Sequence, residues 1–89
     1  MTFQQPHETL RQSMHRLLDR FDYLEPEEDA EYEVDLEEDT GYVRLFGIKE
    51  DDLSECRTVM SDGFETITLE VAEREDGTYV VTANYDELP

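Results

Sequence analysis

Two runs of alternating apolar residues, joined by a Gly-containing turn, most constrain the fold of this 89-residue chain. They cover residues 64–74 and 78–85, and their apolar positions are Ile67, Leu69 and Val71, then Tyr79, Val81, Ala83 and Tyr85. A period of two predicts β-strands. Glu75-Asp76-Gly77 predicts a three-residue hairpin turn that sets Val71 opposite Val81 and Leu69 opposite Ala83. All these apolar side chains then share one face of a sheet.

A second hairpin is predicted earlier in the chain. Residues 32–38 alternate, with Tyr32, Val34 and Leu36 on one side, and residues 42–48 form the returning strand. Asp39-Thr40-Gly41 is predicted as its turn. That turn sets Val34 opposite Phe46 and Tyr32 opposite Ile48, and it places Val43 and Leu45 on the face of the carboxylates.

An amphipathic helix is predicted over residues 6–23. Its apolar stripe follows the helical period: Leu10, Met14, Leu17, Leu18 and Phe21. Pro6 suits the first helical position and Pro26 ends the pattern, with Leu24 folding back onto the core. Residues 25–31 form an acidic loop.

Residues 50–60 leave two alternatives open. Leu53, Cys56 and Met60 fit one face of a short helix, but residues 57–60 also fit a strand before a turn at Ser61-Asp62-Gly63. The favoured interpretation is a helix or turn over 50–56 and a strand over 57–60. The chain is therefore predicted to be a single α+β domain, residues 1–89. One N-terminal amphipathic helix packs on a four- to five-stranded antiparallel sheet within residues 32–85, whose other face is polar and open to water.

The charge of the chain limits its function. Asp and Glu number 25 against 7 Lys and Arg, giving a net charge of −18. Residues 1–24 are balanced, so the whole net charge lies in residues 25–89. Such charge opposes binding to nucleic acid or to anionic membranes and favours basic protein surfaces.

The acidic residues form two clusters that we predict to bind a partner. The first contains Glu27, Glu28, Asp29, Glu31, Glu33, Asp35, Glu37, Glu38 and Asp39, and the second contains Glu50, Asp51, Asp52 and Glu55. Within the first, Glu31, Glu33, Asp35 and Glu37 stand at alternate positions, about 6.8 Å apart on one face of a strand. A nucleic-acid backbone carries one charge per nucleotide at a repeat of several ångströms. The row is therefore predicted to stand in for phosphates, with the second cluster continuing it.

The chain resembles the DNA-mimic proteins of phages and mobile elements in its short length, its single domain, its few lysines and its row of carboxylates over residues 31–37. That class includes anti-restriction and anti-CRISPR inhibitors. The resemblance is one of charge pattern and size. It implies that the chain occupies a basic DNA- or RNA-binding groove of a host defence complex.

Three alternatives to a mimic remain open at this point. Six Arg against one Lys on an acidic surface also fits a salt-adapted structural or housekeeping protein. An antitoxin-like protein would dock through the stripe of the helix. The chain could also bind basic proteins without imitating nucleic acid.

The remaining residues predict no chemistry. Cys56 is the only cysteine, the stretch 50–55 lacks the spacing of an EF-hand, and His7 and His15 lie poorly for sharing a metal on a helix. We therefore predict no enzyme activity, no catalytic residue, no cofactor and no metal site. With no signal peptide or membrane span in sight, the expectation is a cytoplasmic protein, monomer or homodimer.

Overall fold

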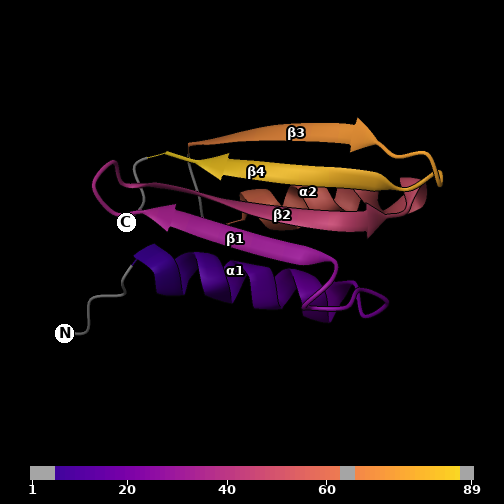
Figure 1. Cartoon of the computed structure of the whole chain (residues 1–89), viewed down its shortest axis with the longest axis horizontal. Coiled ribbons are helices and arrows are strands. Elements are labelled where there is room, and N and C mark those ends of the chain that lie inside the picture. Colours follow the sequence, from indigo (N-terminus) through magenta and orange to yellow (C-terminus); the bar gives the residue numbers. More distant parts are fainter. Residues whose placement is uncertain (1–5, 63–65, 87–89) are drawn as a thin grey trace.

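The computed structural model describes residues 6–62 and 66–86 and confirms the α+β class. In chain order its elements are α1 (Pro6–Arg20), β1 (Ala30–Asp35), β2 (Thr40–Ile48), the 3₁₀ turn η1 (Glu50–Asp52), α2 (Leu53–Ser61), β3 (Ile67–Glu73) and β4 (Tyr79–Tyr85) (Figure 1). No helix among the described residues is long and apolar enough to cross a membrane.

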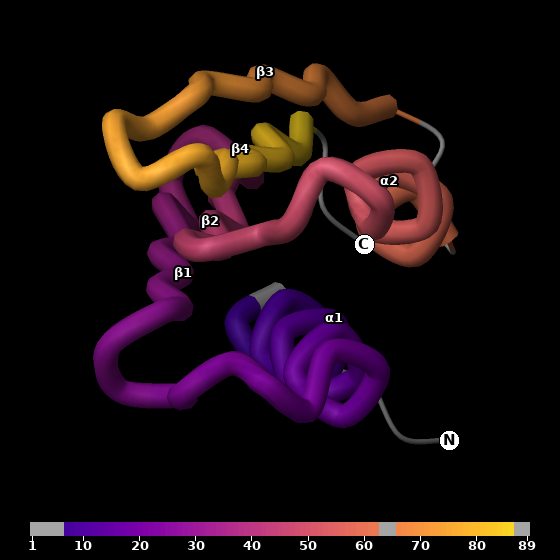
Figure 2. Tube along the Cα trace, turned by 90° about the vertical axis from the view of Figure 1, so that its right-hand side faces the viewer, coloured from indigo at the N-terminus to yellow at the C-terminus, as the bar shows by residue number. Residues whose placement is uncertain are grey.

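The four strands form one antiparallel sheet in the order β1-β2-β4-β3. β1 and β3 are therefore the edge strands. Both helices cover the same face: α1 packs on β1 and β2, and α2 packs on β4 and against α1 (Figure 2). No helix in the described part of the chain covers the other face, which we call the open face.

The predicted stripe of α1 builds much of the core. Leu10, Leu17, Leu18 and Phe21 are buried, and Met14 packs against them. The helix ends at Arg20 rather than at residue 23, but hydrogen bonds from Phe21 N to Leu17 O (2.9 Å) and from Leu24 N to Phe21 O (2.9 Å) extend it as turns. These turns carry Leu24 back into the core, as predicted.

The β3–β4 hairpin has the predicted register. Val71 lies opposite Val81 and Leu69 opposite Ala83. Arg74 N donates to Thr78 O (2.8 Å), which leaves a three-residue turn, and Gly77 has a φ of +86°. Only glycine adopts that conformation without strain, so the turn requires Gly77.

The predicted register of the β1–β2 hairpin is wrong. Val34 lies opposite Gly41 and Tyr32 opposite Val43, and the turn occupies residues 36–39. Asp35 Oδ1 accepts hydrogen bonds from Glu37 N (3.0 Å) and Glu38 N (3.4 Å), which closes the turn earlier than Gly41 would. The shift moves Val43 and Leu45 to the core face and Arg44 to the open face, the reverse of the prediction. Leu36 is exposed.

Gly41 serves packing instead of turning. A Cβ built on it would collide with Leu10 Cδ1 of α1 and would lie 2.6 Å from Glu33 O on β1. Its φ is not positive. The missing side chain therefore allows the start of α1 to lie directly on the β1–β2 hairpin.

The second helix replaces the predicted strand over residues 57–60. α2 runs to Ser61, with Cys56 and Met60 buried and Leu53 packed against the core. These three residues recur at the helical period, so they lie on one face of α2, and the sheet covers that face. The predicted turn at residues 61–63 ends in Gly63, which lies outside the described residues. β1 begins at Ala30, inside the stretch predicted as loop.

Candidate protein-binding surface

β1 presents carboxylates on the open face of the sheet. Its even-numbered residues Ala30, Tyr32 and Val34 pack against the core. The odd-numbered residues lie on the opposite side, each across from a β2 residue: Glu31 from Arg44, Glu33 from Tyr42, and Asp35 from Thr40. Three of the four predicted members of the row therefore share one face. Glu37 does not, because it lies in the turn.

The three carboxylates differ in what they contact. Glu31 forms an ion pair with Arg44, whose Nε donates to Thr82 Oγ1 (3.0 Å) and whose guanidinium lies over the ring of Tyr42. Tyr42 in turn donates its hydroxyl hydrogen to Glu33 Oε2 (3.4 Å). Asp35 caps the turn. Among the described residues, Arg44 thus offsets one charge of the row and no cation pairs with Glu33 or Asp35.

Local burial and these charges also act on Tyr42. Desolvation, followed by the negative charges of Glu31 and Glu33, raises the pKa of its hydroxyl. Ionising Tyr42 would add a further negative charge beside two carboxylates. The hydroxyl therefore remains a hydrogen-bond donor to a higher pH than an ordinary tyrosine hydroxyl does.

Four carboxylates line a hollow where the open face meets the turn between β1 and β2, residues 36–39, which we call the first turn. The hollow has a volume of about 380 Å³, and its acidic lining residues are Glu33, Asp35, Glu38 and Asp86. Among the residues that the structure describes, no Lys or Arg lines it. Asp86 follows β4 and was not predicted, because only the sheet order β2-β4 brings the end of β4 beside the first hairpin.

The acidic loop before β1 is fixed to the sheet at its end. Asp29 Oδ2 accepts a hydrogen bond from Glu25 N (2.9 Å), and Asp29 O accepts one from Phe46 N on β2 (2.8 Å). Glu27 and Glu28 are exposed at the tip. Asp39, at the other end of the row, is exposed with a φ of 53° in the first turn.

The second predicted cluster has a divided role. Glu50 and Asp51 are exposed in η1, whereas Asp52 accepts a hydrogen bond from the Tyr23 hydroxyl (2.9 Å) and Glu55 pairs with Arg20. Burial, and then the Asp52 hydrogen bond, raises the pKa of Tyr23 to about 12. Asp52 and Glu55 therefore tie α1 and its following turns to the start of α2, whereas Glu50 and Asp51 remain exposed.

The second cluster does not prolong the row past the first turn. η1 lies at the same end of the molecule as loop 25–29, whereas turn 36–39 lies at the opposite end (Figure 1). The β3–β4 turn also lies at the η1 end (Figures 1 and 2). This turn adds Glu75 and Asp76, and the end of β3 adds Glu73. The pKa of Tyr79 is raised by the charge of Glu73, then by desolvation and by the charge of Glu50. Charges from the end of β3 and from η1 therefore act on the same side chain. The sequence identified Glu75-Asp76 only as turn residues. Their position beside loop 25–29 and η1 at one end of the molecule depends on the sheet order (Figure 1).

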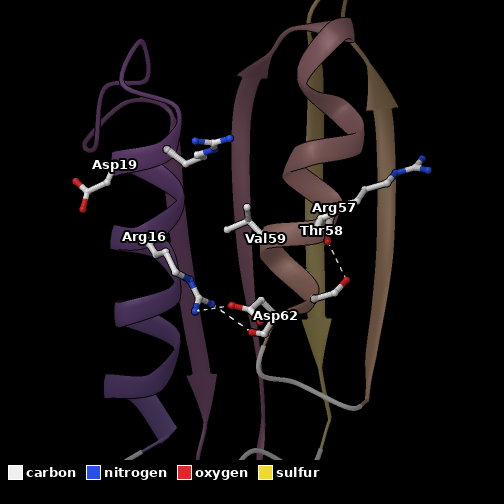
Figure 3. A pocket seen from close by; sticks show the side chains of 8 residues that line it. Arg16, Asp19, Arg57, Thr58, Val59 and Asp62 are labelled. Atoms are coloured by element: carbon white, nitrogen blue, oxygen red, sulfur yellow. Dashed lines mark hydrogen bonds and ion pairs between the residues drawn. The ribbon is translucent and has the colours of Figure 1, made fainter.

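Basic side chains gather elsewhere, in a cleft between the two helices. The cleft has a volume of about 780 Å³ and is lined by Arg16, Arg20 and Arg57 beside Val59 and Asp62. Figure 3 shows Arg16 reaching from α1 toward Asp62, where Nη1 lies 3.2 Å from Oδ2, whereas Arg57 extends away from α1. Three of the seven basic residues therefore line this cleft on the helical side of the molecule, away from the open face.

Within residues 6–62 and 66–86, no group of three or more His, Cys, Asp or Glu is arranged to hold a metal ion. His7 and His15 are both exposed on α1. Comparisons with known proteins found no matching family model, no matching curated protein and no matching solved structure. The surface described above is therefore the basis for a functional proposal.

Proposed function

We propose that this chain is an inhibitory binding protein that occupies a basic nucleic-acid-binding groove of another protein. One observation carries the proposal: loop 25–29, the odd residues of β1 and turn 36–39 follow one another along an edge of the sheet. Residues 25–39 contain ten acids and no Lys or Arg. On β1 the carboxylates repeat about every 6.8 Å, so they present a row of negative groups to a cationic surface.

The mechanism of inhibition is competition for cations. Arg and Lys side chains that normally contact phosphates would form charge-assisted hydrogen bonds with the carboxylates of the row and its flanking loops. Complementary charge speeds the encounter, and added salt slows it. A nucleic-acid-dependent defence complex of a host is the partner that the resemblance to DNA mimics implies.

Removing three charges from this surface is expected to weaken partner binding about tenfold. The variant Glu28→Gln/Glu33→Gln/Glu37→Gln spans loop, strand and turn and spares Asp35, which caps the turn. Three exposed charge contacts of about 0.5 kcal/mol each together amount to about one factor of ten. Affinity for a partner isolated at low salt is the measurement.

A matched control separates position from total charge. Glu8→Gln/Asp19→Asn/Asp22→Asn removes the same number of charges from exposed positions of α1 and the turn after it. It is expected to change affinity by less than twofold. Equal losses in the two triple variants would show that net charge alone drives binding.

Duplex DNA should also displace the chain from the partner, and failure to compete would exclude a mimic.

Stability in dilute salt separates this proposal from salt adaptation. We expect the chain to stay folded at about 50 mM salt, where only charges more than roughly 10–15 Å apart are screened. The reason is a continuous core contributed by both helices and all four strands. A thermal unfolding curve at low salt and another at molar salt are the measurement. A chain that unfolds at low salt and folds at high salt would instead be a salt-adapted protein.

Docking through the helix stripe receives no support from the fold. Leu10, Leu17 and Phe21 are buried against the sheet. An antitoxin-like partner that used this stripe would have to separate α1 from β1 and β2. The open face offers carboxylates without any such opening.

A further inference from the structure

The open face carries an apolar hollow at the end away from the first turn. Phe46, Ala72 and Val80 line it, together with Arg44, Glu70 and Thr82, and its volume is about 480 Å³. Ala72 lies opposite Val80 in the β3–β4 pairing. Phe46 and Val80 are partly exposed and are not part of the core cluster. Elsewhere the described open face is largely polar, with Glu33, Tyr42, Thr68 and Asn84 in one cross-strand line.

An irregularity in β2 holds Phe46 on this face. The pairing of β2 with β4 shifts between Leu45 and Ile48, and Gly47 has a φ of +77°. The extra residue returns Ile48 to the core, where it is fully buried, while Phe46 stays outside. Bulges of this kind redirect side chains.

The backbone around Phe46 is anchored as well. Phe46 N donates to Asp29 O (2.8 Å), so loop 25–29 fixes it from the β1 side. The bulge therefore holds an aromatic side chain beside Ala72 and Val80 on a face that is otherwise largely polar. Such apolar patches with polar rims mark protein interaction sites.

The surroundings of the hollow are charged. Arg44 at one wall is held by Glu31 and Thr82, and Glu70 stands at the other. Farther along the same face lie the carboxylates of Glu33 and Asp35. An apolar centre within a polar, charged rim is the usual anatomy of a protein interface, and aromatic residues at such centres contribute most of the affinity.

We infer that the open face is the docking face, and that the Phe46 hollow takes an apolar side chain from a basic protein segment whose Arg or Lys residues meet the carboxylates. This inference rests on the proposed function and specifies its partner as cationic with an apolar anchor. Charge complementarity selects that occupant. A second copy is disfavoured, because two chains of net charge −18 would bring their carboxylates face to face.

Synthetic peptides of equal length provide the test. One alternates Arg with Leu, a second alternates Arg with Ser, and a third alternates Glu with Leu. Titration followed by amide chemical shifts is expected to show that the Arg–Leu peptide moves the signals of Phe46, Ala72 and Val80. We expect it to bind about tenfold tighter than Arg–Ser, the gain of one apolar anchor, and Glu–Leu is expected not to bind.

Two variants make the test specific. Phe46→Ser should reduce the affinity for Arg–Leu to that for Arg–Ser, and should leave Arg–Ser binding unchanged. Phe46→Leu should restore most of the preference, which a mere loss of folding would not allow. The unfolding temperature of both variants checks that the fold is intact.

The outcomes distinguish the two proposals. Equal binding of Arg–Leu and Arg–Ser, with no shifts at Phe46, overturns the hollow and leaves the acidic surface standing. Shifts from Arg–Leu confined to the edge of β3 also overturn it. Glu–Leu binding as tightly as Arg–Leu overturns the proposed function, because charge complementarity would then play no part.

Discussion

Alkylation of Cys56 is expected to be about a thousandfold slower in the native protein than in the unfolded chain at the same pH. Cys56 is fully buried on α2, with its Sγ 4.0 Å from Met60 Sδ. Burial, and then the negative charge of Asp52, raises the pKa of its thiol from an ordinary value of 9.0 to about 12. Only the thiolate reacts, and three units correspond to about a thousandfold less of it.

Iodoacetamide labelling followed by mass spectrometry measures this protection. The unfolded reference is the same chain in denaturant at the same pH. A native rate within tenfold of that reference would mean that α2 opens readily and that Cys56 reaches solvent. The same label reports folding at each salt concentration, so it also serves the stability comparison proposed above.

The buried thiol links stability to pH in a defined direction. Because its pKa is higher in the folded state, it contributes stability that is complete below about pH 9 and is lost as the pH rises toward 12. Tyr85 acts in the same direction: burial raises the pKa of its hydroxyl, which donates to Met60 O (2.8 Å). The free energy of unfolding should therefore fall at alkaline pH, because ionisation of the thiol and of the Tyr85 hydroxyl favours the unfolded chain.

Gly41→Ala is expected to destabilise the fold by about 3 kcal/mol, the upper part of the usual range for overpacking a core. The added methyl group would meet Leu10 Cδ1 and would lie 2.6 Å from Glu33 O. The leucine can rotate, but the carbonyl belongs to the β1 backbone and cannot retreat without disturbing the β1–β2 pairing. Equilibrium unfolding in denaturant measures the loss.

Gly77→Ala is the matched comparison. A Cβ at Gly77 would meet nothing within 4 Å, but its φ of +86° strains any other residue. That strain costs about 1–2 kcal/mol. A smaller loss for Gly41→Ala than for Gly77→Ala would show that α1 lies less closely on the first hairpin than described.

The two hairpins show what could be predicted from sequence. The β3–β4 register was correct because Glu75-Asp76-Gly77 and the apolar alternation required the same pairing. The β1–β2 register was wrong because Gly41 was interpreted as a turn residue, although its role is to admit Leu10. That role depends on Leu10, a helix residue 31 positions earlier in the chain. The strand predicted over 57–60 was wrong for a similar reason. The β-branched Thr58 and Val59 favour a strand locally, but burial of Cys56 and Met60 on one face favours the helix and decides the structure.

The candidate surface was predictable to a similar degree. Alternation alone placed Glu31, Glu33 and Asp35 together, because side-chain direction along a strand is a local property. The ion pair of Glu31 with Arg44 depends on the register of the β1–β2 hairpin, and the approach of Asp86 depends on the sheet order. Phe46 was predicted to lie opposite Val34, and only the register shift at Gly47 reveals its position on the open face.

The position of β1 at the rim of the sheet has a second consequence. A bare rim strand offers its unpaired amides and carbonyls to any similar strand, which is how sheets grow from molecule to molecule. Two such rims facing each other here would set Glu31, Glu33 and Asp35 against their own counterparts, and that repulsion keeps the molecules apart. Variants that neutralise these side chains should therefore be examined for self-assembly as well as for lost affinity.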